Sequence, residues 1–287
     1  APVGGRSPDA AIPIPRATPA ARRAARELGV DLVALQVAGR IREDDVRAFH
    51  AAGRGAPGVD GAVAYRGRRR TIAERMTQSL ATTAQVTFST EVGVDRAIEM
   101  VDALNEEWRA EGVVATLTRL VVKACARALR DHPRFNARLV GDEIVPMPDV
   151  NIGIALDQEA GLVVPVVRNV DGLSLREVSR TARELGERGR ADRLWPADVD
   201  GGTFTVTSLA STVVDAFTPI INPPQAAILG VGRVRDAVGF DASGPVPRRV
   251  TTLSLTFDHR LNDGAPAARF LGRIVELVER PYVLVGE

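Results

Sequence analysis

The residues with the clearest chemical potential lie near the C-terminus, in the run Asp258-His259-Arg260-Leu261-Asn262-Asp263-Gly264. His259 precedes Asp263 by four residues, and a glycine follows the aspartate directly. Histidine is the side chain whose ordinary pKa, about 6.5, lets it gain or lose a proton near neutral pH. Such a base, beside a carboxylate and a glycine turn, is what acyl transfer to a thiol or alcohol requires. The other two histidines lack this setting, since His50 ends a helical run and His132 precedes a proline.

Composition restricts the class of protein. The 287 residues, 45% of them hydrophobic, allow one large domain with a substantial core and one small domain. A net charge of +1 favours neither nucleic acid nor a membrane surface as a partner. No stretch approaches the roughly 18 apolar residues of a membrane span, and no secretory signal opens the sequence. The lone Cys125 lies in an apolar run, which indicates a buried, inert thiol in preference to a nucleophile. We therefore expect a cytoplasmic protein without a metal.

Proline, glycine and helix-capping residues divide the N-terminal part. Thr18 followed by Pro19 predicts a helix start, and Gly29 ends this first helix after Leu28. A second short helix is expected from Arg42 to Phe49. Two helices of this size form either a small docking module or an arm of a larger domain. The predicted division is a linker at 1–15, the compact module at 16–50, a flexible linker at 51–64 and the main domain at 65–287.

The main domain alternates between helical and strand periodicity. The segment 116–130 is apolar almost all round, so it predicts a central buried helix. Strands separated by helices indicate an α/β fold in which strands pair over long sequence distances. The expected helices are 70–80, 96–109, 116–130, 174–190 and 264–277, and the expected strands are 85–92, 150–156, 161–167, 204–209, 225–234 and 250–257.

Six motifs in this domain occur in a familiar order and together resemble one family. They are RTIAERM at 70–76, VNIGIA at 150–155, GLVVPV at 161–166, GTFTVT at 202–207, INPPQAAILG at 221–230 and the DHR…DG run at 258–264. The set closely resembles the catalytic domain of the dihydrolipoamide acyltransferases, the E2 components of 2-oxo acid dehydrogenase complexes. The resemblance implies a two-layer α/β (α+β) fold like that of chloramphenicol acetyltransferase, with a mixed sheet, beside a small all-α docking module.

Residues 16–50 resemble the peripheral subunit-binding domain of the same family. That module docks the E1 or E3 partner enzyme chiefly through arginines, which by motif position would be Arg22, Arg26 and Arg40. Guanidinium groups suit this role because they make planar, charge-assisted contacts with acidic surfaces. The alternative is that these arginines form a solvated helix face. The run Leu35-Gln36-Val37-Ala38 is shorter than the glycine-rich loop usual in the family, which bears on how tightly a partner docks.

The family's lipoyl domain carries lipoate on a lysine in a tight hairpin. Lys123 is the only lysine here, and it lies within the predicted central helix. The resemblance therefore implies that lipoate is carried on another domain or chain. Either the chain is a fragment cut within the linker, or it takes acyl-lipoyl groups from a separate protein.

The reaction implied by the resemblance is exchange of an acyl group between dihydrolipoamide and coenzyme A. In it, His259 would act as general base on the thiol of coenzyme A, which is a substrate. Thr207 matches the position that holds the oxyanion, with Ser208 as a rival hydroxyl. Asp263 would either orient the imidazole or lock its loop by pairing with an arginine.

The resemblance also implies an assembly and a substrate channel. Family members are homotrimers that join into larger shells, and His259 of one subunit would face Thr207 of the next. Gly161, Leu162 and Val163 would line the channel for the pantetheine arm, or would be an ordinary core strand. Two departures bear on the site: Asn262 replaces an apolar residue, and Ala210-Ser211-Thr212-Val213-Val214 replaces a glycine-rich turn.

Two other functions remain open from the sequence. One is a non-catalytic scaffold that only binds E1 or E3, which the presence of His259 disfavours. The other is a coenzyme A-dependent O- or N-acyltransferase of the chloramphenicol type, which the docking-like module disfavours. The motifs do not distinguish acetyl, succinyl and branched-chain groups.

Overall fold

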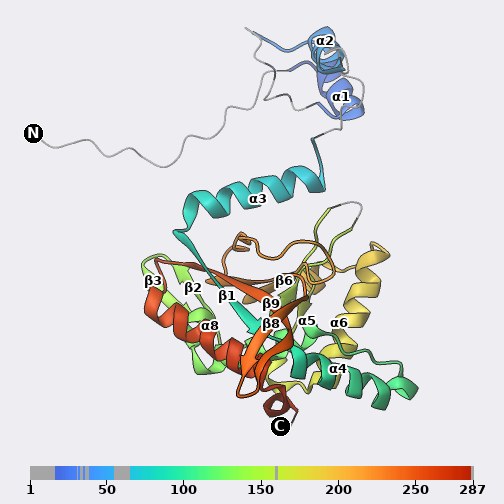
Figure 1. Cartoon of the computed structure of the whole chain (residues 1–287). Coiled ribbons are helices and arrows are strands. Elements are labelled where there is room, and N and C mark those ends of the chain that lie inside the picture. The colour runs from blue at the N-terminus through green and yellow to red at the C-terminus, as the bar shows by residue number, and fades with distance from the viewer. Residues whose placement is uncertain are drawn as a thin grey trace, which may run out of the picture. The chain divides into compact units, whose positions relative to one another are not determined.

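The computed structural model describes residues 17–30, 32, 35, 39–54, 65–158 and 161–285. The chain forms two compact units, Ala1–Ala64 and Tyr65–Glu287 (Figure 1). The predicted linker at 1–15 and most of the one at 51–64 lie outside the described residues.

The small unit contains two helices, α1 (Pro19–Leu28) and α2 (Glu43–Arg54). Thr18 caps α1 through its hydroxyl, which accepts a hydrogen bond of 3.1 Å from the backbone N–H of Ala21, and Gly29 ends the helix at a φ of 64°. The first helix is thus as the sequence predicts. The second extends past Phe49 to Arg54, into the range predicted as linker.

The large unit is built on a mixed seven-stranded sheet. Its strand order is β1-β9-β7-β6-β4-β5, with β8 paired to β9. The neighbours β4, β6 and β7 are parallel, and the other pairs are antiparallel. The strands are β1 (Gln85–Gly93), β4 (Ile152–Ile154), β5 (Val166–Val167), β6 (Phe204–Ser208), β7 (Ala227–Val231), β8 (Arg235–Asp241) and β9 (Gly244–Asp258).

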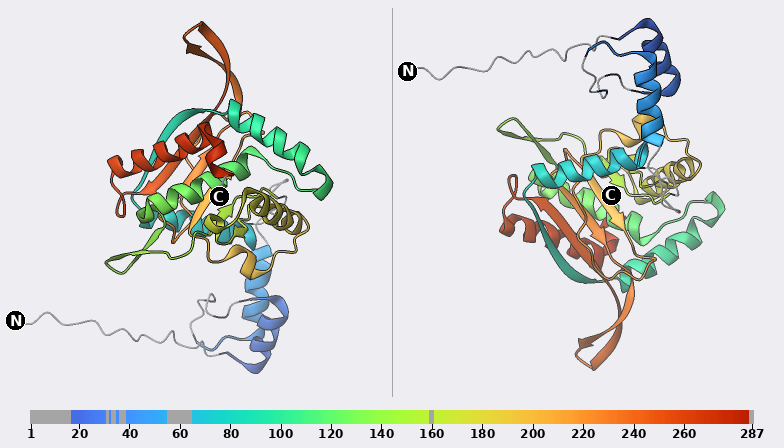
Figure 2. Two further views of the ribbon diagram at one scale, coloured as in Figure 1. Left: turned by 90° about the horizontal axis from the view of Figure 1, so that it is seen from below. Right: turned by 90° about the horizontal axis from the view of Figure 1, so that it is seen from above.

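One face of this sheet packs against helices. The central helix is α5 (Leu117–Asp131), whose buried face includes Leu120 to Ala126, as its apolar pattern predicts. It lies beside α8 (Gly264–Glu279) and α6 (Leu175–Arg190), with α4 (Asp95–Glu107) at the edge (Figures 1 and 2). On the sheet, this core face carries alternate residues such as Phe204 and Val206. The expected two-layer α/β arrangement with a mixed sheet is confirmed.

Two further helices, one of them the single turn α7 (Pro196–Val199), and a two-stranded sheet belong to the same unit. Helix α3 (Arg68–Thr82) is anchored by the buried hydroxyl of Ser79, which donates a hydrogen bond of 2.6 Å to the carbonyl oxygen of Ile221. A two-stranded sheet of β2 (Ala137–Val140) and β3 (Glu143–Pro146) is a feature that sequence reasoning missed. Its strands have only four residues each, so they carry little periodicity.

Several predicted strands are shorter than expected, among them 225–234, which gives only β7 (Ala227–Val231). Residues 150–156 give only β4, and residues 161–167 give only β5 together with one isolated bridge between Leu156 and Val163. By contrast, β9 extends well before Val250 because it forms a hairpin with β8. This hairpin projects from the body of the unit in Figure 2.

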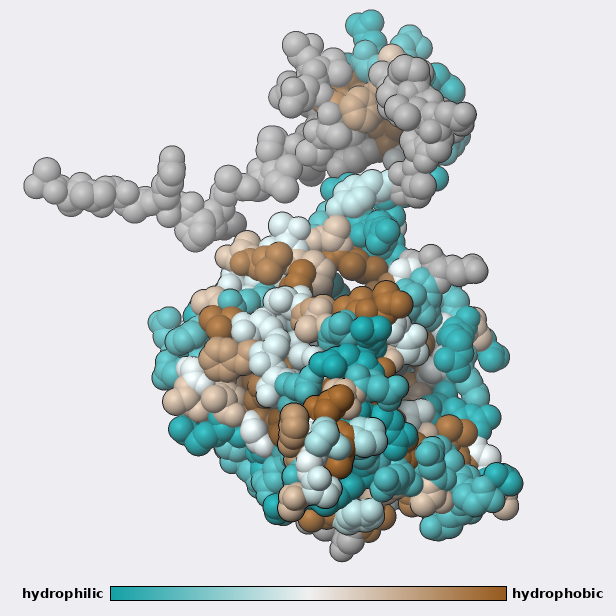
Figure 3. All heavy atoms as spheres, viewed as in Figure 1, coloured by the Kyte–Doolittle hydropathy of each residue, from teal (hydrophilic) through white to brown (hydrophobic). Residues whose placement is uncertain are grey.

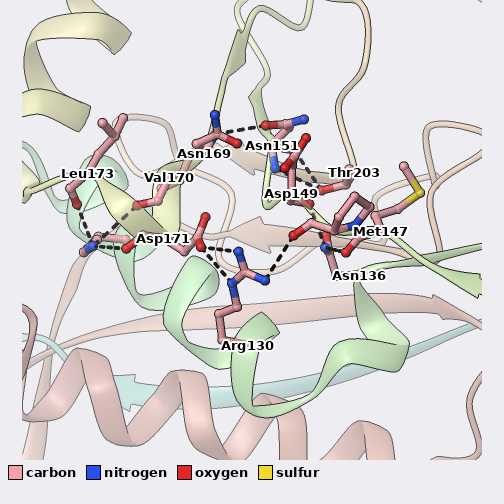
Figure 4. Close-up of polar contacts among 12 residues, drawn as sticks. Arg130, Asn136, Met147, Asp149, Asn151, Asn169, Val170, Asp171, Leu173 and Thr203 are labelled. Atoms are coloured by element: carbon pink, nitrogen blue, oxygen red, sulfur yellow. Dashed lines mark hydrogen bonds and ion pairs between the residues drawn. The ribbon is translucent and has the colours of Figure 1, made fainter.

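The only lysine has a structural role. The Nζ of Lys123, a buried residue, donates to the carbonyl oxygens of Val170, Asp171 and Leu173 at 3.4, 3.1 and 2.6 Å. Figure 4 shows these carbonyls together with Arg130, which pairs with Asp171. The lysine therefore holds the turn that follows β5.

No helix among the described residues is long and apolar enough to cross a membrane. The described part of the chain also holds no group of three His, Cys, Asp or Glu residues that could bind a metal ion.

Candidate active site

His259 follows the C-terminal end of β9, where the chain turns toward α8. Its backbone N–H donates a hydrogen bond of 2.8 Å to the carbonyl oxygen of Ala84, at the start of β1. Its ring lies beside the ring of Phe257, with 5.8 Å between centroids. The side chain is 46% exposed. A base fixed at its backbone and open at its ring can meet a substrate proton without any rearrangement of the fold.

The residues on either side of His259 pair with each other. The carboxylate of Asp258 is buried and accepts hydrogen bonds from Nε and Nη2 of Arg260. It also accepts from the backbone N–H groups of Ala84 and Arg260, at 3.2 and 3.1 Å. These bonds tie the histidine's loop to itself and to the start of β1, so they fix the direction in which the ring leaves the backbone.

A second set of contacts ties the same loop to the segment before β2. Nη2 of Arg134 donates to the carbonyl oxygen of Leu261 at 2.6 Å, and Nδ2 of Asn262 donates to the carbonyl oxygen of Arg134 at 3.1 Å. Leu261 is buried in a small cluster with Ala137 and Ala226. Sequence reasoning noted Asn262 as a departure but missed Arg134, because nothing in the motif order indicates that this distant residue reaches the loop.

Asp263 lies at the N-terminal end of α8 and is largely exposed. Its Oδ1 is 3.8 Å from Nδ1 of His259, which is longer than a hydrogen bond, and 78% of its side chain is accessible. It makes no side-chain capping bond to the helix. Among the described residues, its ion-pair contact is with the histidine, and the alternative in which it pairs with an arginine has no counterpart there.

Thr207 and Ser208 lie on opposite faces of the sheet. The hydroxyl of Ser208 accepts a hydrogen bond of 3.0 Å from Thr118 of α5, which places it on the helix-covered face. Because successive side chains of a strand alternate, Thr207 points to the other face, as does Thr205, whose hydroxyl donates to Gln225 at 2.7 Å. Both residues are partly exposed, but the hydroxyl of Ser208 is directed toward α5 and Thr207 is directed away from it.

His259 and Thr207 are far apart within one chain. Thr207 lies opposite Gly230 of β7, and Gly230 lies opposite Ser254 of β9, five residues before His259. At about 3.4 Å per residue and about 4.8 Å per strand, the two backbone positions are roughly 20 Å apart. A single chain cannot bring both groups to one reacting atom.

The predicted channel segment lies beside α3. A Cβ added at Gly161, whose φ is 114°, would lie 3.2 Å from Cδ1 of Ile72, and Leu162 is 46% exposed. Val163 bonds to Leu156 in both directions. The following residues, Val164 and Val166, line a pocket of about 440 Å³ that is also bordered by α3 and by the segment 222–225.

The three arginines predicted to bind a partner are exposed on the small unit. Arg22 and Arg26 lie one helical turn apart on α1, and Arg40 precedes Ile41, which bridges to Ala17 just before that helix. None of the three forms an ion pair with another described residue, so their guanidinium groups remain available for an acidic surface.

Hydrophobic side chains also reach the surface of the large unit. Figure 3 shows them gathered in several patches between hydrophilic ones. Patches of this kind commonly mark surfaces that another protein covers. The large exposed hydrophobic residues of this unit include Leu80, Leu162, Trp195, Val199, Val213, Val238 and Phe240.

Comparison with known proteins defines the class. Residues 58–285 match the family described as 2-oxoacid dehydrogenases acyltransferase (catalytic domain), and residues 15–47 match the e3 binding domain. The chain therefore belongs to the family of 2-oxoacid dehydrogenase acyltransferases and carries its subunit-binding module.

Similar proteins include two acetyltransferase components. One belongs to the acetoin cleaving system of Bacillus subtilis (strain 168) and is 35% identical over 93% of this chain and 70% of its own length. The other belongs to the mitochondrial pyruvate dehydrogenase complex of Schizosaccharomyces pombe and is 34% identical over 94% of this chain. This chain spans only 61% of that second relative.

Solved structures of the same family superpose on the large unit. The cubic core of a pyruvate dehydrogenase multienzyme complex matches with a TM-score of 0.73 and 34% identity, over 75% of this chain and 89% of that one. The dihydrolipoamide acetyltransferase of Azotobacter vinelandii matches with a TM-score of 0.75 and 34% identity, over 78% and 93%.

In the Azotobacter vinelandii enzyme, a serine, a histidine and an asparagine were investigated for roles in the catalytic mechanism. The serine lies 52 residues before the histidine, and the asparagine lies four after it. Thr207, His259 and Asp263 have the same two spacings here.

Proposed function

We propose that this protein transfers an acyl group from acyl-dihydrolipoamide to coenzyme A, as the E2 component of a 2-oxo acid dehydrogenase complex. The observation that carries the proposal is His259, a half-exposed base whose backbone is held by Ala84 and whose neighbours are locked as an ion pair. The shared spacing with the three investigated residues of the Azotobacter vinelandii enzyme supports the same assignment.

The reaction requires a proton acceptor and a group that donates a hydrogen bond to the oxyanion. His259 takes the proton of the coenzyme A thiol, and the sulfur attacks the carbonyl carbon of the acyl thioester. The carbonyl oxygen becomes an oxyanion, which the Thr207 hydroxyl stabilises by a hydrogen bond. Collapse of the tetrahedral intermediate breaks the bond to the lipoyl sulfur, which leaves as a thiol after receiving the proton from the imidazolium. Acyl-coenzyme A and dihydrolipoamide are the products.

The two groups come from different copies of the chain in this proposal. Within one chain they are roughly 20 Å apart by strand geometry, so a neighbouring copy must supply one of them. The exposed hydrophobic residues of the large unit are suited to such contacts, and a homotrimer is the smallest ring that the family resemblance implies. A larger shell, like the cubic core among the solved structures, is compatible with the same trimer.

Partner docking belongs to the small unit. We assign Arg22, Arg26 and Arg40 to contact with an acidic surface of E1 or E3, because they are exposed and have no recorded ion pair among the described residues. Lipoate comes from another domain or chain, since Lys123 is buried and bonded to three carbonyl oxygens. A cytoplasmic location is part of the proposal.

The test is a steady-state assay of the purified protein with coenzyme A and acyl-dihydrolipoamide donors. We expect turnover that falls by at least about 100-fold in His259→Ala. His50→Ala, in the small unit, serves as the matched control and should retain full turnover. A scaffold would show no turnover in the unsubstituted protein. An O- or N-acyltransferase would instead transfer acetyl from acetyl-coenzyme A to an alcohol or amine, so those acceptors are assayed in parallel.

A further inference from the structure

The surface around Thr207 is defined by its two neighbours across the sheet. On one side, β4 continues its parallel pairing with β6, and the N–H of Ala155 donates to the carbonyl oxygen of Val206 at 3.0 Å. On the other side lies Gly230 of β7. Residues aligned on neighbouring parallel strands point to the same face. Ala155, Thr207 and Gly230 therefore form one row on the face of the sheet opposite α5.

An aromatic ring stands over one end of this row. A Cβ added at Gly230 would lie 2.9 Å from Cζ of Phe217 and 3.2 Å from its Cε2. The ring thus occupies the space that a side chain at Gly230 would take, which places it directly beside the Thr207 side chain. Phe217 is only partly buried, so one part of the ring is free to contact a ligand.

The segment that carries Phe217 is fixed to the sheet. The N–H of Arg233 donates to the carbonyl oxygen of Val214 at 2.8 Å, and the guanidinium of Arg233 pairs with Asp215. A Cβ at Gly232 would overlap the carbonyl oxygen of Asp215, so the segment packs on bare backbone there. Two glycines beneath the segment and an ion pair at its side hold its backbone close to β7.

These contacts determine the space for an acyl group. If the Thr207 hydroxyl holds the oxyanion, the acyl chain begins within a few ångströms of that hydroxyl, because an oxyanion donor lies about 3 Å from its oxygen. The neighbouring groups are a methyl at Ala155 and an aromatic ring at Phe217. Neither offers a positive charge for an acyl carboxylate, and Arg233, which follows β7, is already paired with Asp215.

We propose that Phe217 is a specificity-determining residue that limits the acyl group to a short, uncharged one of the acetyl class. This inference rests on the proposed function, and it goes beyond it by naming the acyl class and the side chain that sets it. Larger branched groups would meet the ring, and a dicarboxylic group such as succinyl would have its second carboxylate desolvated beside it without a partner.

The experiment compares acetyl-, propionyl-, isobutyryl- and succinyl-dihydrolipoamide as donors to coenzyme A. The unsubstituted protein should use acetyl best by kcat/KM. Phe217→Ala should raise the isobutyryl-to-acetyl ratio of kcat/KM by about 10-fold or more, the discrimination that one or two methyl groups support in an apolar pocket. Succinyl should stay poor in both proteins, because removing the ring adds no cation.

Two further variants serve as an alternative to the alanine variant and as a control. Phe217→Leu retains a large side chain and is used if the alanine variant does not fold, with a smaller shift in the same direction expected. Thr218→Ala is the matched control, since Thr218 is the exposed residue next to Phe217, and it should leave the ratio unchanged. Circular dichroism and the state of assembly are measured for each variant.

The outcomes distinguish the inference about Phe217 from the proposed acyltransferase function on which it rests. An unsubstituted protein that prefers isobutyryl or succinyl overturns the inference, as does a folded, active Phe217→Ala whose ratio is unchanged. In both cases activity that still depends on His259 leaves the acyltransferase function standing. Absence of transfer from every donor would instead remove the proposed function itself.

Discussion

Asp258 and Arg260 form an ion pair that spans the histidine between them. Nη2 of Arg260 lies 2.6 Å from Oδ2 of Asp258, and Nε lies 3.0 Å from each carboxylate oxygen. The carboxylate is almost fully buried, whereas the guanidinium is 41% exposed. The hydrogen bond to Asp258 raises the pKa of Arg260. The pair therefore acts as a brace for the loop that presents His259.

Asp258→Asn tests this brace. The variant removes the charge that Arg260 and two backbone N–H groups face, and we expect a loss of about 1–3 kcal/mol in the free energy of unfolding. Urea unfolding at fixed protein concentration measures it, because the stability of an oligomer depends on concentration. Asp142→Asn, an exposed change in the β2–β3 turn, is the control. An unchanged urea midpoint in Asp258→Asn would show that the brace contributes nothing.

Substitutions at the adjacent residues Thr207 and Ser208 should have different effects on kcat. Thr207→Ala should lower kcat by about 100- to 1,000-fold, the effect of losing one oxyanion donor, while Thr207→Ser keeps a hydroxyl and should retain most of the rate. Ser208→Ala removes a hydroxyl that faces Thr118 of α5 and should alter kcat less than tenfold. Measuring kcat for the three variants decides the assignment, and equal losses at both positions would refute it.

Asp263 is a candidate catalytic residue whose exposure predicts a mild phenotype. Its carboxylate is 3.8 Å from the imidazole and mostly in solvent, and the Azotobacter vinelandii enzyme has an asparagine at the same spacing. We expect Asp263→Asn to change the unfolding free energy by less than about 0.5 kcal/mol, as surface substitutions do, and to retain most of the turnover. A loss as large as that of His259→Ala would instead show that the negative charge takes part in the reaction.

The sequence predicts the elements of the core better than their edges. The buried helix α5 was predictable because its apolar residues cover nearly the whole surface of the helix. The hairpin of β2 and β3 was not, since its strands are four residues each, which is too short for an alternating pattern to stand out. The strand predicted over 161–167 shrank to Val166–Val167, because the run before it pairs through a single bridge. An apolar run alone does not fix hydrogen-bonded register.

The residues of the site also differ in how well the sequence predicts them. His259 stands out in the sequence by residue type and motif, whereas Arg134 and Phe217 reach their places through long-range contacts. Arg134 lies 127 residues from Leu261, whose carbonyl it binds. Phe217 acquires its neighbour through the glycine at 230 on another strand. Tertiary proximity of this kind leaves no local periodicity for the sequence to show.

Cys125 should behave as an inert thiol. It is fully buried in α5, and burial raises its pKa well above the ordinary value. We expect no reaction with a thiol reagent at pH 8 in the folded protein and full reaction in denaturant. The unfolded thiol ionises above about pH 8.5 while the folded one stays protonated. This group's contribution to stability is therefore complete below that pH and is lost as the pH rises further. Rapid labelling of the native protein would contradict the assignment.

Lys123 provides the sharpest test of a buried charge in the fold. Its ammonium group donates to three carbonyl oxygens of the turn at 170–173, where the chain leaves β5 for α6. Lys123→Met keeps the length of the side chain but leaves those carbonyls without this donor, and we expect a loss of about 1–3 kcal/mol in unfolding free energy. Arg109→Met, at a side chain that is 76% exposed, is the matched control. If both variants unfold at the same urea concentration as the unsubstituted protein, the three bonds are offset by the cost of burying the charge, as happens for some buried ion pairs.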